Sequence, residues 1–296
     1  MSRFGHLAQR LFNVPLAIHP KKAEIVMGAL AERLGIVSLE NTARTPASAF
    51  FYDDDDDFGF GGPGAVVTDP GYDLVEGVAL IQVSGTLVQK LGSARPFSGM
   101  TGYDGIREAF GAALADDEVL AIVLQIDSGG GEVAGCFDLV DDIYGARGQK
   151  PIAAILDENA FSAAYAIASA ADPGRIYVPR TGGTGSIGVI CMHVDWSEAL
   201  SKAGLRVTFI HYGERKTDGH PEIPLTAEAL AAFQADIDAM GDLFVQTVAR
   251  NRGLDAAKVR GFEAGTFQGP AGVTAGLADK VMAPAAALQA VLAELA

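Results

Sequence analysis

Three segments that follow predicted strands contain glycines or a serine, residue types that could bind a ligand or act as a nucleophile. The first, residues 127–131, places three consecutive glycines directly after a strand predicted at residues 122–126. In open α/β sheets, ligand sites form beyond the carboxyl ends of the strands. Glycine N–H groups can approach a ligand closely, which suits an oxyanion or a phosphate. A plain tight turn is the alternative interpretation.

Ser162 is the candidate nucleophile of the second segment, residues 158–164, which follows a strand predicted at residues 151–156. Its small neighbours would permit the sharp strand-to-helix turn on which a nucleophilic serine is presented. A serine that begins a helix is also an ordinary N-cap, and position alone favours the cap.

A third glycine-rich segment, residues 181–188, contains a formal G-x-G-x-x-G from Gly183 to Gly188. That dinucleotide fingerprint needs a helix after it, whereas residues 187–194 are predicted to form a strand. The sequence therefore disfavours a nicotinamide site.

A serine nucleophile needs a base. The histidines lie in the N-terminal segment, inside predicted strands or outside evident active-site loops: His6, His19, His193, His211 and His220. Lys216 lies in a polar, glycine-bounded segment, residues 212–219, after a strand predicted at residues 206–211. A lysine can act as a general base where burial lowers its pKa. Position alone favours a solvated loop lysine.

The elements that must position these residues alternate between strands and helices. Strands are predicted at residues 77–83, 119–126, 151–156, 175–178, 187–194 and 206–211, and helices at residues 103–114, 134–146, 162–171, 197–203 and 226–251. This alternation predicts an α/β domain with a largely parallel sheet at residues 75–284. A helical segment, residues 1–45 with a helix at 21–34, would precede it, then an acidic, glycine-rich linker at residues 46–74. Residues 285–296 would form a helical tail.

Composition excludes several classes of protein. Of the 296 residues, 49% are hydrophobic, which excludes a wholly disordered chain. A net charge of −15 disfavours a nucleic-acid partner. Two cysteines, Cys136 and Cys191, cannot form a disulfide framework, and the chain is predicted to be intracellular and soluble, without a membrane anchor. No metal-binding motif is present, and the five aspartates of Asp53–Asp57 are predicted to be a solvated linker.

Taken together, five segments resemble peptidase family S49, the signal peptide peptidase A group, over residues 75–281. They are residues 78–88, 126–135, 160–172, 175–190 and 212–219. The match is closest to the phage and prophage branch, the head-maturation (capsid assembly) proteases. One departure is Gly129, where the family usually has proline, which makes the glycine loop more flexible.

The resemblance implies a role for each candidate residue. Ser162 would be the nucleophile and Lys216 its general base. The backbone N–H groups of Gly130 and Ala163 would form the oxyanion hole, and Ser186 would orient the lysine amine. The implied fold is a ClpP/crotonase-like spiral of ββα units. No cofactor or metal is expected, and the implied assembly is a homo-oligomeric ring. In this family the serine and lysine of one site can come from one protomer or from neighbouring protomers.

The expected function is therefore a Ser-Lys endopeptidase that cleaves capsid and scaffold proteins during phage or prophage head maturation. It would act in the cytoplasm of the bacterial host cell or inside the assembling prohead. Any scaffold region would be a separate chain or a further part of the same chain. Three alternatives remain: a non-catalytic assembly component with this fold, a cellular signal-peptide or quality-control protease, and a crotonase-type acyl-CoA enzyme.

Overall fold

A largely parallel sheet forms the centre of the molecule, in a computed structural model that describes residues 13–20 and 69–295. Within these residues, ten strands join one sheet with the central order β10-β7-β6-β5-β3-β2. The pairs β3–β5, β5–β6 and β6–β7 are parallel. The strands are β1 (Leu16–Ile18), β2 (Asp73–Val75), β3 (Val78–Val88), β4 (Met100–Gly102), β5 (Ala121–Glu132), β6 (Ile152–Phe161), β7 (Ile176–Val178), β8 (Gly183–Gly185), β9 (Thr266–Gln268) and β10 (Lys280–Val281).

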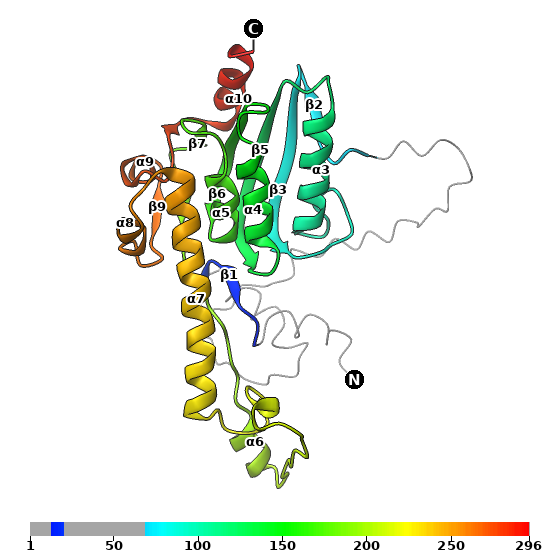
Figure 1. Ribbon diagram of the computed structural model, residues 1–296, viewed down its shortest axis with the longest axis vertical. Helices are drawn as coiled ribbons and strands as arrows, with labels where there is room; N and C mark the ends of the chain where they lie inside the picture. Colours follow the sequence, from blue (N-terminus) through cyan, green and yellow to red (C-terminus); the bar gives the residue numbers. More distant parts are fainter. Residues whose placement is uncertain (1–12, 21–68, 296) are drawn as a thin grey trace, which may run out of the picture.

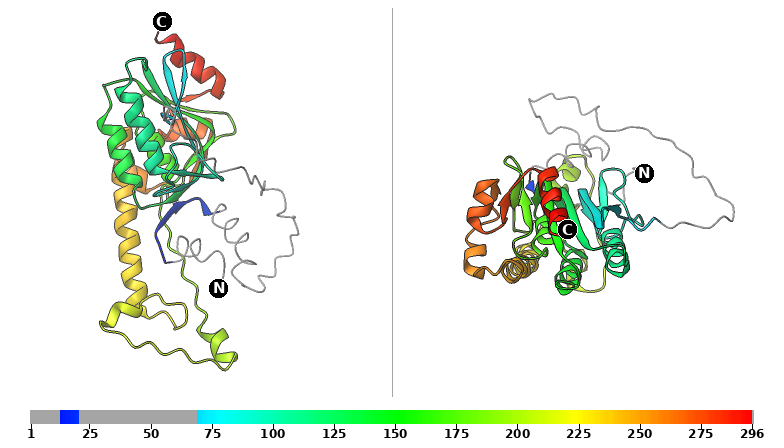
Figure 2. Two further views of the ribbon diagram at one scale, coloured as in Figure 1. Left: turned by 90° about the vertical axis from the view of Figure 1, so that its right-hand side faces the viewer. Right: turned by 90° about the horizontal axis from the view of Figure 1, so that it is seen from above.

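Helices cover both faces of this sheet (Figure 1). They are α3 (Tyr103–Ala115), α4 (Cys136–Gly145), α5 (Ala163–Ser169), α6 (Ser197–Lys202), the 3-10 helix η1 (Glu214–Thr217), α7 (Ala227–Arg252), α8 (Ala256–Arg260), α9 (Pro270–Ala275) and α10 (Pro284–Ala293). Helices α3, α4 and α5 lie on one face and α10 on the other (Figure 2). Among the described residues, no helix has the length and apolar character needed to cross a bilayer.

The core follows the two-residue alternation of the strands. Ile122, Leu124 and Ile126 of β5 pack into the larger cluster with α3, α4 and α5. Ala121 and Val123 of the same strand point the other way, into a smaller cluster with α10. Both faces of β5 are therefore buried, as expected for a central parallel strand.

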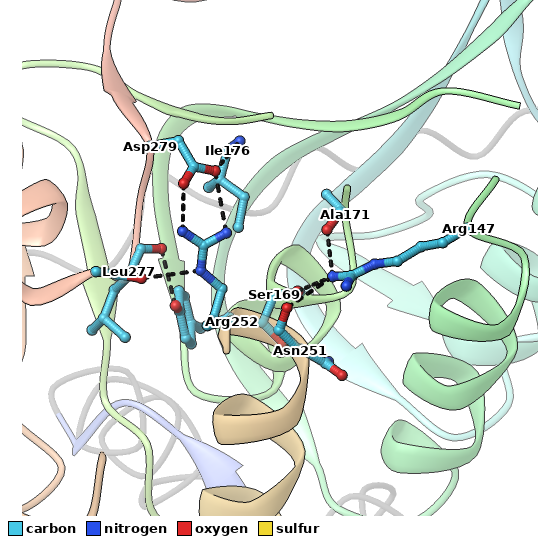
Figure 3. A network of polar contacts seen from close by, with 10 residues as sticks. Arg147, Ser169, Ala171, Ile176, Asn251, Arg252, Leu277 and Asp279 are labelled. Carbon is cyan, nitrogen blue, oxygen red and sulfur yellow. Dashed lines mark hydrogen bonds and ion pairs between the residues drawn. The ribbon is translucent and has the colours of Figure 1, made fainter. Parts of the chain in front are cut away.

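The long helix α7 has one end packed on the body and one end that extends away from it (Figure 1). Thr226 caps its start, because its side chain accepts a hydrogen bond of 3.1 Å from the N–H of Ala229. Near its other end, Arg252 forms a bidentate ion pair with Asp279 at 2.6 and 3.2 Å, and Asn251 donates to Ser169 Oγ at 2.9 Å (Figure 3). These contacts join α7 to β7 through Asp279, and to α5.

The sequence predictions of the helices are confirmed to within two residues at each end for α3, α4, α5, α6 and α7. The predicted α/β class and mostly parallel sheet are also confirmed. Three predicted strands begin where expected but end five or six residues later, namely β3, β5 and β6. The segments predicted as loops after β5 and β6 are therefore largely strand.

Two predicted strands are wrong. Residues 187–194 contain an isolated bridge, Leu16 to Ile190, in place of a strand. Residues 206–211 form no strand in this part of the described chain, and Ile210 is 99% exposed. Apolar β-branched residues suggested strands in both places. Residues 187–194 form one bridge to β1 and do not extend it into a strand, whereas residues 206–211 pair with no strand of the described chain.

The predicted N-terminal helical segment also needs a correction. Residues 16–18 form the strand β1 and not a helix, because they pair with the end of β5. The predicted helix at residues 21–34 and the aspartates of Asp53–Asp57 lie outside the described residues. The next strand of the sheet, β2, begins at Asp73, inside the predicted linker 46–74.

Candidate active site

Ser162 occupies a strained turn between β6 and α5. Its φ and ψ are 55° and −123°, a conformation that L residues rarely adopt and that costs about 1–3 kcal/mol. Its side chain makes no capping hydrogen bond, which contradicts the N-cap interpretation. A backbone bond of 2.9 Å from Ser162 N–H to the Gly185 carbonyl holds the turn. Strain at a serine that leads into a buried helix is typical of a presented nucleophile.

The alanines of α5 explain how this turn fits into the core. All seven residues of α5 are buried, and four of them are alanine. Small side chains let the helix lie close to β5 and β6, and Tyr165 anchors it through a 2.9 Å hydrogen bond to the Leu277 carbonyl. Ser162 is thus positioned by the packing of the whole helix.

The glycine segment at the end of β5 lies directly beside Ser162. Gly130 has a φ of 94°, and a Cβ placed on it would lie 3.0 Å from Ser162 Cβ and 3.0 Å from the Phe161 carbonyl oxygen. Only glycine fits this position without strain. The structure therefore brings the two predicted residues, Gly130 and Ser162, together.

The predicted oxyanion donors are both adjacent to Ser162. Ala163 is the first residue of α5, so its N–H is among those that a helix leaves without an intrahelical partner. The N–H of Gly130 donates to Ser128 Oγ at 3.1 Å, and that hydroxyl donates to the Gly85 carbonyl at 2.7 Å. An oxyanion would therefore have to replace Ser128 as the acceptor for Gly130.

Ser162 Oγ and Ser186 lie in the same part of the fold. Ser162 Oγ donates a long hydrogen bond of 3.4 Å to the Gly188 carbonyl. Ser186 directly follows β8, which pairs with the end of β6, and it is buried with a φ of 54°. Of the predicted site residues, Ser162, Ala163, Gly130 and Ser186 thus lie on neighbouring segments.

Lys216 is the exception. It is exposed in η1, within the segment that Figures 1 and 2 show beyond the far end of α7, away from α5. The fold of a single chain therefore does not bring Lys216 to Ser162.

A cavity of about 580 Å³ opens beside the glycine segment. Its lining includes His19, Asp127, Gly129, Asn159 and Phe161. Asp157 lies nearby. Burial raises the pKa of its carboxyl group, hydrogen bonds from Gln125 oppose this increase, and the charge of Asp127 adds to it. This cavity is large enough for peptide side chains.

The described residues support neither a metal site nor a dinucleotide site. No group of three His, Cys, Asp or Glu side chains there could hold a metal ion. No helix follows the G-x-G-x-x-G segment within residues 186–196. Sequence reasoning missed β1, which lies against the site, and its run Val14–His19 carries no motif that would have revealed this pairing.

Comparison with known proteins gives this geometry a context. The family model described as Peptidase family S49 matches residues 146–296. The chain is 40% identical over 281 residues to the head-tail preconnector protein GP5 of Enterobacteria phage P21, covering 94% of this chain and 55% of that protein. It is 37% identical over 284 residues to the capsid assembly protease C of Escherichia phage lambda, covering 94% and 63%.

A more distant relative is a putative signal peptide peptidase SppA of Enterococcus faecium, 27% identical over 170 residues, 56% of this chain and 48% of that protein. The chain thus spans a little over half of the length of its two phage relatives.

Proposed function

Because the chain belongs to peptidase family S49, we propose that it is a serine endopeptidase with Ser162 as its nucleophile. The observation that carries this proposal is the strained turn at Ser162, with φ 55° and the glycine of Gly130 packed against it. Strain at a non-glycine residue persists where the surrounding fold enforces it, and it concentrates at functional sites. The mixed α/β sheet agrees with the ClpP-like fold of the family.

Lys216 is the general base of this proposal, and its neutral amine takes the proton from Ser162 Oγ. The oxygen then bonds to the scissile carbonyl carbon, and the N–H groups of Gly130 and Ala163 stabilise the oxyanion. The lysine ammonium returns the proton to the leaving amine as the C–N bond breaks. Water next attacks the carbonyl carbon of the acyl ester while Lys216, which Ser186 orients, takes a proton from it. The bond from that carbon to Ser162 Oγ then breaks, and Lys216 returns the proton to Ser162 Oγ.

A second copy of the chain supplies Lys216 in this proposal. Within one chain Lys216 lies in a segment remote from α5 (Figure 1). The same segment exposes apolar side chains that an isolated chain would leave in water: Leu205 at 58%, Ile210 at 99% and Tyr212 at 100%. Exposed apolar residues of this kind mark interaction surfaces. A homo-oligomeric ring would bury them and bring each Lys216 to a neighbouring Ser162.

The proposed substrates are capsid and scaffold proteins of a phage or prophage, cleaved during head maturation in the cytoplasm of the bacterial host cell or inside the assembling prohead. Support comes from two relatives that each match 94% of this chain. One is named as a head-tail preconnector protein and the other as a capsid assembly protease, and both are phage proteins. Both relatives extend beyond the matched region.

The test is intact-mass spectrometry of capsid and scaffold proteins encoded beside the gene, co-expressed with the unmodified chain or with Ser162→Ala. We expect discrete fragments with the unmodified chain and none with Ser162→Ala. Ser169→Ala is the matched control, because Ser169 is a buried serine at the other end of α5. Its hydroxyl bonds Ala166 and Asn251 and none of the proposed site residues.

Fragments that persist with Ser162→Ala would contradict the assignment of the nucleophile. No fragments with any folded variant would favour the non-catalytic assembly component. Loss of fragments with Ser169→Ala as well, despite a folded chain, would mean that the readout reports the packing of α5 and not the nucleophile.

A further inference from the structure

The N-terminal strand β1 is hydrogen-bonded on both of its edges, although it is three residues long. On one edge it pairs antiparallel with β5, in the register Leu16–Glu132, Ala17–Gly131 and Ile18–Gly130, and His19 N–H continues the ladder to the Gly129 carbonyl at 2.8 Å. On the other edge Leu16 exchanges two backbone bonds of 2.8 and 2.9 Å with Ile190. Residues 16–18 thus fill a slot between two separate segments of the domain.

This slot lies beside Ser162. The point that a Cβ on Gly130 would occupy lies 2.2 Å from the Ala17 carbonyl oxygen and 3.0 Å from Ser162 Cβ. The backbone of β1 therefore runs beside both the nucleophile and the proposed oxyanion loop. With β1 in place, Ser162 is 0% exposed, so a peptide that reaches Ser162 must displace part of the fold that covers it.

Side chains hold both ends of the inserted segment. Asn13 donates from Nδ2 to the Gly219 carbonyl at 2.7 Å, and its Oδ1 lies 3.0 Å from His193 Nδ1. At the other end the ring of His19 packs against that of Phe161 with centroids 5.0 Å apart. Leu16, Ala17 and Ile18 are all at most 5% exposed. The segment is therefore held at both ends and buried between them.

We propose that β1 is an intramolecular peptide ligand of the active-site groove, which a substrate must displace. The inference rests on the proposed peptidase function, because an endopeptidase must bind an extended chain beside its nucleophile. Main-chain hydrogen bonds supply the affinity when a peptide adds as a strand to a sheet edge. Since β1 belongs to the same chain, it competes at a high effective concentration. The groove takes an extended apolar peptide with a small residue at the position of Ala17.

The test measures peptide binding in a Ser162→Ala background, so that it needs no catalysis. The probe is a fluorophore-labelled synthetic peptide with the sequence of residues 13–20, followed by fluorescence anisotropy. Leu16→Pro removes the N–H that Leu16 donates to Ile190, whereas the matched Leu16→Ile keeps that N–H and the apolar volume. We expect Leu16→Pro to bind the peptide at least ~10-fold more tightly than Leu16→Ile. Equal affinities of the two folded variants would overturn the proposal.

A second variant covers the case in which Leu16→Pro fails to fold. Leu16→Cys with Ile190→Cys, in a Cys191→Ser background, places two thiols across the bridged pair and can lock β1 in the slot. The oxidised protein should not bind the peptide, and reduction should restore the binding. Binding that is unaffected by oxidation would overturn the inference. A chain that shows this binding behaviour but cleaves nothing would instead contradict the proposed function.

Discussion

Gly130 shows at the scale of single residues why the proposed site cannot tolerate a side chain. A Cβ there would lie 2.2 Å from the Ala17 carbonyl oxygen and 3.0 Å from Ser162 Cβ, on a backbone with φ 94°. An added methyl group must therefore move the loop, and with it the N–H that is proposed to stabilise the oxyanion.

We expect Gly130→Ala to lower peptidase turnover by at least ~100-fold, because loss of one oxyanion donor has effects of that size. Gly111→Ala is the control: Gly111 lies in α3 with no atom within 4 Å of its added Cβ. That control should retain turnover and gain about 0.5–1 kcal/mol in the free energy of unfolding. Steady-state kinetics with thermal unfolding checks both, and full activity of Gly130→Ala would exclude its N–H as a required donor.

Asp157 allows a prediction about pH. Burial, with a contribution from the charge of Asp127, raises the pKa of Asp157 above its unfolded value of 3.8. The stability that this group contributes is therefore fully present below pH 3.8 and is lost as the pH rises through the folded pKa. Asp157→Asn should raise the melting temperature at pH 7, and the gain should vanish as the pH falls toward 3.8.

Asp104→Asn should change the melting temperature in the opposite direction and lower it at pH 7. Burial opposes ionisation of Asp104, but hydrogen bonds from the N–H groups of Leu91, Gly92 and Gly105 outweigh it and lower the pKa of the carboxyl group. Its contribution is present above the unfolded pKa and is lost as the pH falls through the folded one. Calorimetry across pH 3 to 8 compares the melting temperatures of the two variants with that of the unmodified chain. Changes of the same sign at pH 7 would contradict the environments assigned to Asp157 and Asp104.

At the scale of elements, the ion pair between Arg252 and Asp279 joins α7 to the sheet. The arginine side chain is 6% exposed and the aspartate 19%, and Asp279 also accepts from the N–H of Ile176 at 2.9 Å (Figure 3). Removal of one partner leaves the other charge buried without compensation. This pair fixes the end of the helix whose far end leads back to η1.

Arg252→Met should therefore lower the free energy of unfolding by about 3 kcal/mol. Lys202→Met is the control, because its pair with Glu198 lies on the surface with both side chains at least 75% exposed, and its effect should stay below about 0.5 kcal/mol. Urea unfolding measures both. Similar effects from the two substitutions would mean that the buried pair has no special role in holding α7.

The helices were predictable from the sequence because their periodicity, and for α7 the cap at Thr226, are local signals. The ends of β5 and β6 were not, because Gly129–Gly131 is a poor strand former that the neighbouring strands nevertheless hold extended. The strand predicted at residues 206–211 failed for the opposite reason, since its apolar residues have no partner edge. Strand β1 escaped prediction because its partners lie more than 100 positions away.

The candidate site also combines residues that local sequence patterns reveal with one whose position depends on the tertiary fold. Ser162, Ala163 and Gly130 could be predicted, since each follows a strand that the sequence reveals, and the fold places them together. Ser186 also lies close by in the fold. The distance of Lys216 from Ser162 within one chain could not be predicted, because it depends on the direction in which α7 leaves the body.

The whole molecule consists of a packed α/β body and an arm formed by the far half of α7 with the segment that contains α6 and η1 (Figures 1 and 2). The body contains Ser162, and the arm contains Lys216 and the exposed Ile210 and Tyr212. Under the proposed function, a neighbouring copy covers this arm. The molecule is therefore expected to be active as an assembly, with each site built from two chains.

The most direct test of this account is complementation between two inactive variants. Ser162→Ala and Lys216→Ala should each cleave no substrate alone. After they are mixed in equal amounts and allowed to exchange subunits, about a quarter of the unmodified activity should return, because random mixing of neighbours pairs an intact Ser162 with an intact Lys216 at that frequency. No recovery in mixed assemblies, with exchange verified by native mass spectrometry, would contradict a Ser-Lys site shared between copies.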